Sequence, residues 1–137
     1  MRFAARLRPA LFALLLLAPA APRAQELLGP GDFRAYAEGR TLYFALSGTP
    51  FGAEQYLPGN RVIWQYADGS CTRGIWYARQ ALICFVYEGD GAELCWQFLQ
   101  DGQRFLARSV DAEPAAELEV IGRDRRPLSC PGPGVGV

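Results

Sequence analysis

The sequence contains no histidine and no lysine among its 137 residues. Without histidine the chain has no Ser-His or Cys-His arrangement for nucleophilic catalysis, and it lacks the commonest general base and metal ligand. It also has no Cys-x-x-Cys pair, which is the usual mark of a thiol redox site or a structural zinc site. We therefore expect no catalytic residue, no metal and no cofactor, and a protein that is not an enzyme.

Long apolar runs are scarce as well. The run Ala10–Ala18 follows a basic N-terminus, ends at Pro19, and is not followed by a second such run. This is the pattern of a cleaved secretory signal, and a short membrane anchor is the alternative. We predict a signal peptide over residues 1–24, with cleavage after residues 20–24. The mature protein is then periplasmic or secreted, with no stable membrane insertion.

The charge balance disfavours one class of partner. The whole chain is neutral, but from Gln25 onward it has 10 arginines and 14 acidic residues, a net charge of −4. A mildly acidic protein is a poor candidate for binding a phosphate backbone. We expect no nucleic-acid partner.

Four cysteines are present in this short chain. In an exported protein of this size they indicate a disulfide framework. Four cysteines allow three connectivities, and the count alone does not choose among them.

The residues after the signal read as one β-rich domain, 25–130, followed by a flexible Pro/Gly tail, 131–137. Asp32 is in the position of a helix N-cap, and Phe33, Tyr36 and Ala37 follow at helical spacing as far as Gly39. SGTPFGAE (47–54) is predicted as a loop, and 113–122 as either a helical turn or a last strand. Short apolar runs separated by turn residues predict strands at 41–46, 61–67, 71–77, 81–87, 93–100 and 103–110.

The fold class expected is mainly β: a single small antiparallel meander, strongly curved or barrel-like, with one short N-terminal helix and a C-terminal tail tied by a disulfide. An open sheet with the helix and tail over one face is the alternative. The turns provide a test of strand register. If Gly89-Asp90 is a two-residue loop, Cys84 lies opposite Cys95, whereas a five-residue loop would place Cys84 opposite Trp96. By elimination, Cys71 then pairs with Cys130.

Three further turns, at Asp68-Gly69, 78–80 and Asp101-Gly102, extend this register argument to the neighbouring strands. Together they predict that the following side chains share one face: Val62, Trp64, Tyr66, Ile75, Tyr77, Ile83, Phe85, Leu94, Trp96, Phe98 and Phe105.

Arg73 is the odd residue on that face, where an interior guanidinium needs a carboxylate, a ring or a bound anion. It either anchors a ligand inside the barrel or reaches water at an open end. The candidate ligand-facing residues are accordingly Trp64, Tyr66, Arg73 and Trp96, with a plain core as the alternative for the aromatic ones. The acidic turn at Glu88, Asp90 and Glu93 is either solvated or a weak Ca²⁺ site.

One part of the sequence resembles a family of small exported proteobacterial proteins that has no established activity. The shared residues are Gly52-x-Glu54, Arg61-Val62-x-Trp64, Gly69-x-Cys71, Gly74-x-Trp76, Ile83-Cys84-Phe85-x-Tyr87 and Cys95-Trp96. The resemblance implies export and a common fold, and it implies no activity.

The function expected is the binding of a small ligand or a protein partner in the cell envelope. A secreted inhibitor that acts through the loop 47–54 is the alternative, and a hydrolase ranks third. A cavity behind Trp64 and Arg73 would favour a ligand, whereas a filled core with a protruding loop would favour an inhibitor.

Overall fold

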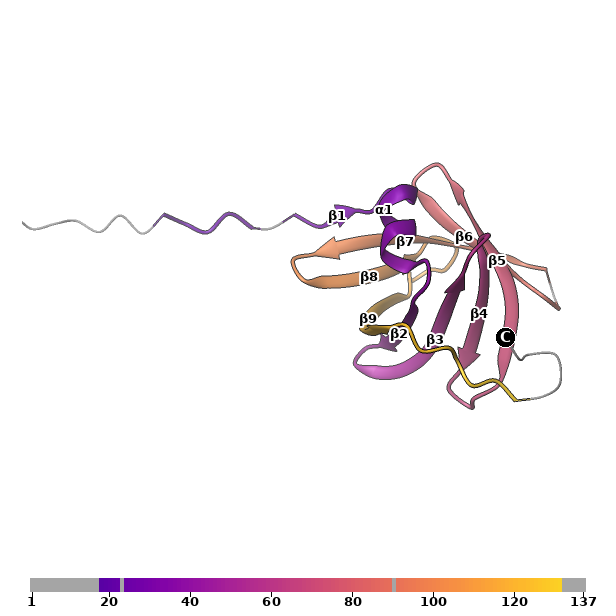
Figure 1. Ribbon diagram of the computed structural model, residues 1–137. Helices are drawn as coiled ribbons and strands as arrows, with labels where there is room; N and C mark the ends of the chain where they lie inside the picture. The colour runs from indigo at the N-terminus through magenta and orange to yellow at the C-terminus, as the bar shows by residue number, and fades with distance from the viewer. Residues whose placement is uncertain (1–17, 23, 90, 132–137) are drawn as a thin grey trace, which may run out of the picture.

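The computed structural model describes residues 18–22, 24–89 and 91–131 of the chain. In these residues the chain forms one helix and nine strands (Figure 1). The elements are β1 (Glu26–Leu27), α1 (Pro30–Ala37), β2 (Thr41–Leu46), β3 (Thr49–Leu57), β4 (Arg61–Tyr66), β5 (Cys71–Arg79), β6 (Leu82–Tyr87), β7 (Glu93–Asp101), β8 (Arg104–Ser109) and β9 (Glu117–Asp124).

The strands close into a barrel. From β2 to β9 each strand pairs antiparallel with the next one along the chain, and β9 also pairs with β2. Over the described residues this is an eight-stranded antiparallel meander barrel, with the short β1 added beside β7. The predicted fold class is confirmed, and the closed form is the correct one of the two architectures. Within the same residues, no helix is long and apolar enough to cross a membrane.

Strand β3 lies where a loop was predicted. The predicted loop 47–54 is wrong, because only Ser47 and Gly48 form a turn, with φ of 49° and 80°, and β3 begins at Thr49. A β-bulge conceals the alternation of β3: Phe44 is opposite Gly52 but Ala45 is opposite Pro50, which leaves Phe51 as the extra residue. Of the two alternatives for 113–122, the last strand is confirmed, because β9 covers much of that segment.

Helix α1 begins two residues earlier than the predicted N-cap at Asp32. Gly29 is its N-cap, and Pro30 occupies the first turn, where a proline loses no helical hydrogen bond. The helix buries Phe33 and Ala37 completely. The Phe33 ring contacts rings on three strands of the barrel, with centroid distances of 5.5 Å to Tyr56, 5.1 Å to Trp76 and 4.4 Å to Phe98. Phe33 therefore lies near the barrel axis, and α1 closes one end (Figure 1).

Strand β5 has the opposite orientation from the one predicted. Its hairpin with β4 has a three-residue loop, since Gln65 is opposite Cys71, and its hairpin with β6 has a two-residue loop, since Arg79 is opposite Leu82. The β4–β5 register differs by one residue from the prediction and the β5–β6 register by three, so β5 alone is inverted and its neighbours keep their faces. Trp76 is consequently buried inside the barrel, whereas Ile75 is 51% exposed.

The two misread turns have separate physical reasons. At the first, Asp68 accepts hydrogen bonds from the backbone N–H and the hydroxyl of Ser70, and Gly69 adopts φ of 88°. This is a three-residue loop that ends in a left-handed residue. At the second, Gln80 adopts φ of 55°. The sequence does not predict this left-handed conformation, because glutamine rarely adopts it.

The other two predicted hairpins keep their faces. Cys84 is opposite Cys95, as predicted from a two-residue loop, although Asp90 in that loop lies outside the described residues. In the β7–β8 hairpin, Phe98 is opposite Ala107 rather than Phe105. This register differs by two residues from the prediction, so the side chains stay on the predicted face.

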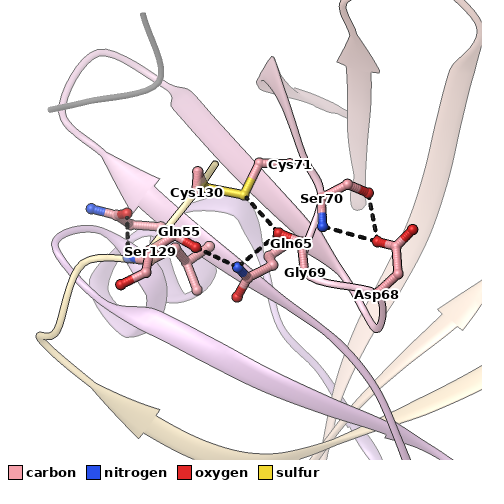
Figure 2. Close-up of a disulfide and its surroundings, with 9 residues drawn as sticks. Gln55, Gln65, Asp68, Gly69, Ser70, Cys71, Ser129 and Cys130 are labelled. Carbon is pink, nitrogen blue, oxygen red and sulfur yellow. Dashed lines mark hydrogen bonds between the residues drawn. A yellow bond between two sulfur atoms is a disulfide. The ribbon is translucent and has the colours of Figure 1, made fainter. Parts of the chain in front are cut away.

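Both predicted disulfides are present, Cys84–Cys95 and Cys71–Cys130. The second fastens the residues after β9, which run across the outside of the barrel (Figures 1 and 2). On the way, Leu128 N–H donates to the Gln55 side chain at 3.0 Å, and the Gln65 side chain donates to the Ser129 carbonyl at 2.7 Å (Figure 2). The tail therefore covers polar groups of the outer wall and leaves the interior free.

The predicted ends of the chain fall largely outside the described residues. Most of the predicted signal peptide, 1–24, falls on residues 1–17, which the structure does not describe. The predicted tail, 131–137, falls on the undescribed residues 132–137 except for its first residue. Both stay predictions.

Replacing Phe33 with alanine should destabilise the barrel. We expect Phe33→Ala to lower the free energy of unfolding by about 3–5 kcal/mol, because a fully buried aromatic ring leaves a cavity behind. Ile121→Ala is the control, since Ile121 is 55% exposed and should change stability by less than about 0.5 kcal/mol. Denaturant unfolding followed by circular dichroism measures both, and equal losses would contradict the placement of Phe33.

The Cys71–Cys130 bridge spans 59 residues. We expect the double variant Cys71→Ala/Cys130→Ala to lose about 4 kcal/mol of stability, because the bridge restricts a long loop in the unfolded chain. The measurement is urea unfolding of the oxidised proteins, with Ser129→Ala as a control that leaves the bridge intact. A loss below about 1 kcal/mol would show that the tail docks without the bridge.

Candidate functional site

The end of the barrel opposite α1 contains an internal cavity of about 240 Å³. Tyr56 and Phe98 form its floor, with Phe33 of α1 behind them. Its lining comes mainly from aromatic and aliphatic side chains that point inward from the strands. They are Phe44, Phe51, Glu54, Tyr56, Trp64, Tyr66, Phe85, Tyr87, Leu94, Trp96, Phe98, Ala107 and Leu118.

The mouth of this cavity is apolar and open to solvent. Phe51, Tyr66 and Leu94 line the cavity and are 43%, 51% and 44% exposed. Large apolar side chains grouped at one opening are a common feature of binding sites, since a protein surface otherwise leaves them scattered. The mouth is therefore the accessible entrance to the interior.

Three of the four predicted ligand-facing residues line the cavity: Trp64, Tyr66 and Trp96. Arg73 does not, because the inversion of β5 puts it on the outer wall, opposite Ile63. There it lines a second hollow of about 610 Å³ together with Arg61, Ile75 and Glu88. The second hollow is larger, but it lies on the outside of the wall. We take the interior hollow as the candidate site, because aromatic and apolar side chains line it around a single carboxyl group.

Two local features of β3 place the Trp64 ring in the cavity. A Cβ atom on Gly52 would overlap the indole ring, so the absence of a side chain at Gly52 makes room for it. The neighbouring bulge directs Phe51 toward the mouth, where its ring centroid lies 6.0 Å from that of Trp64. Phe44 approaches Trp64 from β2 at 5.9 Å. The three rings thus form one side of the cavity.

Glu54 is the polar group of the interior. It is 2% exposed and lies between Leu42 of β2 and Trp64 of β4 in the sheet. The Tyr87 hydroxyl donates to its carboxyl group and lies 2.9 Å from each of the two oxygens. Among the described residues, no arginine forms an ion pair with it.

Burial changes the protonation of this carboxyl group. Removal from water raises the pKa of Glu54 to about 8, and the hydrogen bond from Tyr87 opposes part of that rise. Burial likewise raises the pKa of Tyr87, and the nearby Glu54 adds to the increase. At neutral pH the site therefore holds a mostly protonated carboxylic acid next to a neutral phenol.

Tyr87 is held over Glu54 by its neighbours on β5 and β6. A Cβ on Gly74 would lie 2.8 Å from the Tyr87 ring, so only glycine lets the ring approach β5 this closely. The ring also stacks on Phe85, with an interplanar angle of 4°. These contacts fix the direction in which the hydroxyl points.

Sequence reasoning missed Glu54 and Tyr87 as site residues. The signal that could have found Glu54 is the alternation Gly52, Glu54, Tyr56, which continues across the Pro58-Gly59 turn into Val62 and Trp64. Reading 47–54 as a loop concealed it. Tyr87 follows Ile83 and Phe85 at the same period of two, so the sequence could have predicted that its side chain points inward. The sequence could not have predicted that Glu54 is its hydrogen-bond partner.

Cys84, Glu93 and Cys95 lie close enough together to suggest a metal site. Both cysteines are oxidised in the same disulfide, so neither offers a thiolate ligand. Glu93 forms an ion pair with Arg79 at 2.6 Å. The alternative of a Ca²⁺ site at this turn included Asp90, which lies outside the described residues.

Comparison of the chain with models of protein families, with curated proteins and with solved structures finds no match. The resemblance to an exported proteobacterial family therefore stays a prediction. The fold and the site define the class: a disulfide-bonded small antiparallel β-barrel with an aromatic cavity at one end.

The pKa of Glu54 makes stability depend on pH. Between pH 4.5, the ordinary pKa of a glutamate, and pH 8, the unfolded chain releases the proton while the native state keeps it. Stability should therefore fall by about 1.4 kcal/mol per pH unit across this window and level off above it. In Glu54→Gln this decrease in stability with rising pH should vanish, and in the exposed control Glu88→Gln it should persist. Urea unfolding at intervals from pH 4 to pH 9 measures it, and parallel profiles for all three proteins would contradict the buried protonated acid.

Proposed function

We propose that the protein is an exported, non-enzymatic binding protein that holds one small, largely apolar ligand in the open end of its barrel. The observation that carries the proposal is the aromatic cavity with its apolar mouth. An eight-stranded barrel has room inside for a filled core or for one small ligand. Here α1 fills one end, and the other end is left hollow.

The volume limits the size of the ligand. Pockets for drug-sized molecules measure roughly 300–1,000 Å³, and this cavity measures about 240 Å³. A ligand of about the size of one substituted ring fits that space, with its flat faces against Trp64 and Trp96. The rim residues Phe51, Tyr66 and Leu94 are placed to cover its outer end.

Two observations support this function over the inhibitor alternative. The segment 49–57, which contains most of the predicted inhibitory loop, is a strand of the barrel wall. Only Ser47 and Gly48 protrude as a turn, which is too short to insert into a partner's active site. For location, two disulfides in a small domain are typical of an oxidising compartment, which supports export.

Propylbenzene is a suitable neutral probe, since it has one ring and a short chain and does not absorb where tryptophan is excited. We expect it to change the tryptophan emission of the protein saturably, because Trp64 and Trp96 line the cavity. Leu94→Trp should block the mouth and weaken binding by about tenfold or more. Ile75→Trp, at a similarly exposed site on the outer wall, is the matched control and should bind normally. No saturable binding to the wild-type protein would overturn the proposed function.

A further inference from the structure

Glu54 gives the cavity a chemical preference beyond apolarity. Of the described side chains that line the cavity, it alone carries a carboxyl group, and none carries a basic group. Resting on the proposed function, we infer that the ligand is an organic cation whose ammonium group pairs with Glu54 and whose apolar body lies among the rings.

No described residue provides the carboxyl group with a counter-charge. Its hydrogen-bond donor is Tyr87, and a single phenol proton cannot satisfy both carboxylate oxygens. A buried ionised carboxylate is costly unless a cation pairs with it. A ligand ammonium group would supply the missing charge and would add N–H donors to the single proton that Tyr87 shares between the two oxygens.

The rings around Glu54 suit a cation as well. An ammonium group is attracted to the faces of aromatic rings, most strongly to tryptophan. Trp64 and Trp96 line the cavity, and Trp64 is the cross-strand neighbour of Glu54. A cation would thus meet electron-rich rings and a carboxyl group that can lose its proton to pair with it, whereas an anion would find no opposite charge among the described side chains that line the cavity.

Binding exchanges a proton for the ligand. In the free protein near neutral pH the Glu54 carboxyl carries a proton. When the charged amine binds, the carboxyl becomes a carboxylate and its proton passes to the buffer, while the ammonium keeps its own protons. The charge inside the barrel is zero before and after, so the exchange avoids an unpaired buried charge.

The other titratable groups that face Glu54 do not obscure this exchange. They are the phenols of Tyr56 on β3, Tyr66 on β4 and Tyr87 on β6. Phenols are uncharged near neutral pH. The cross-strand neighbours from β2 and β4, Leu42 and Trp64, do not titrate.

Phenylethylamine tests the inference, because its ammonium group replaces the terminal methyl group of propylbenzene at nearly the same shape. We expect the wild-type protein to bind it more tightly than propylbenzene at pH 8 and to bind phenylacetate far more weakly. Below pH 8 the affinity for phenylethylamine should fall about tenfold per pH unit, while that for propylbenzene stays constant. Calorimetry at pH 7 in buffers of different ionisation enthalpy should show about one proton released per ligand.

Glu54→Gln is the decisive variant, because glutamine keeps the shape and the hydrogen bond to Tyr87 without the charge. It should weaken phenylethylamine binding about thirtyfold or more, a much larger loss than it causes for propylbenzene. Tyr87→Phe is a second variant: losing the hydrogen bond raises the pKa of Glu54 further, so the pH at which phenylethylamine binding reaches its plateau should move upward.

The outcomes separate the two proposals. If the wild-type protein and Glu54→Gln bind phenylethylamine equally, or if no proton is released, the inference is overturned while propylbenzene binding upholds the proposed function. If propylbenzene does not bind the wild-type protein, the proposed function itself fails.

Discussion

Closure of the barrel is the constraint on which the rest of the structure depends. The pairing of β9 with β2 removes the free edges of the sheet and forces every second side chain of β2–β9 into one small interior. That interior has two ends, of which one is filled by a side chain and the other is hollow. Phe33 fills one end from α1, where it contacts rings from three strands. Within the part of the chain that the structure describes, the other end has no such insert and is hollow.

The covalent ties are on the outside of the barrel, which leaves the interior free. Cys84–Cys95 links neighbouring strands on the face away from Ile83 and Phe85. Cys71–Cys130 holds the tail against the outer wall through Gln55 and Gln65 (Figure 2). A domain of this size gains much of its stability from such bridges. The interior can therefore hold a cavity and a buried carboxyl group, each of which lowers stability.

Glycines at two positions connect the wall to the site. Gly52 makes room for the Trp64 ring, and Gly74 lets the Tyr87 ring approach β5 closely. Each glycine therefore shapes the cavity from a strand next to the one that carries the ring. Glu54 follows Gly52 by two residues on β3, with its carboxyl group buried and hydrogen-bonded to Tyr87. The site is thus part of the packing of the barrel wall rather than an addition to its loops.

The sequence by itself determined the fold class, most strands, the Cys84–Cys95 register and the inward direction of Trp64, Tyr66 and Trp96, because alternation and tight turns are local properties. It did not determine the face of β5, since the pairing of β5 differs from the expected one by one residue against β4 and by three residues against β6. The strand β3 was hidden by its bulge. Only the tertiary structure decided that Arg73 faces outward and that Glu54 is buried beside Tyr87. Those placements depend on pairing between strands and on closure, which no single segment encodes.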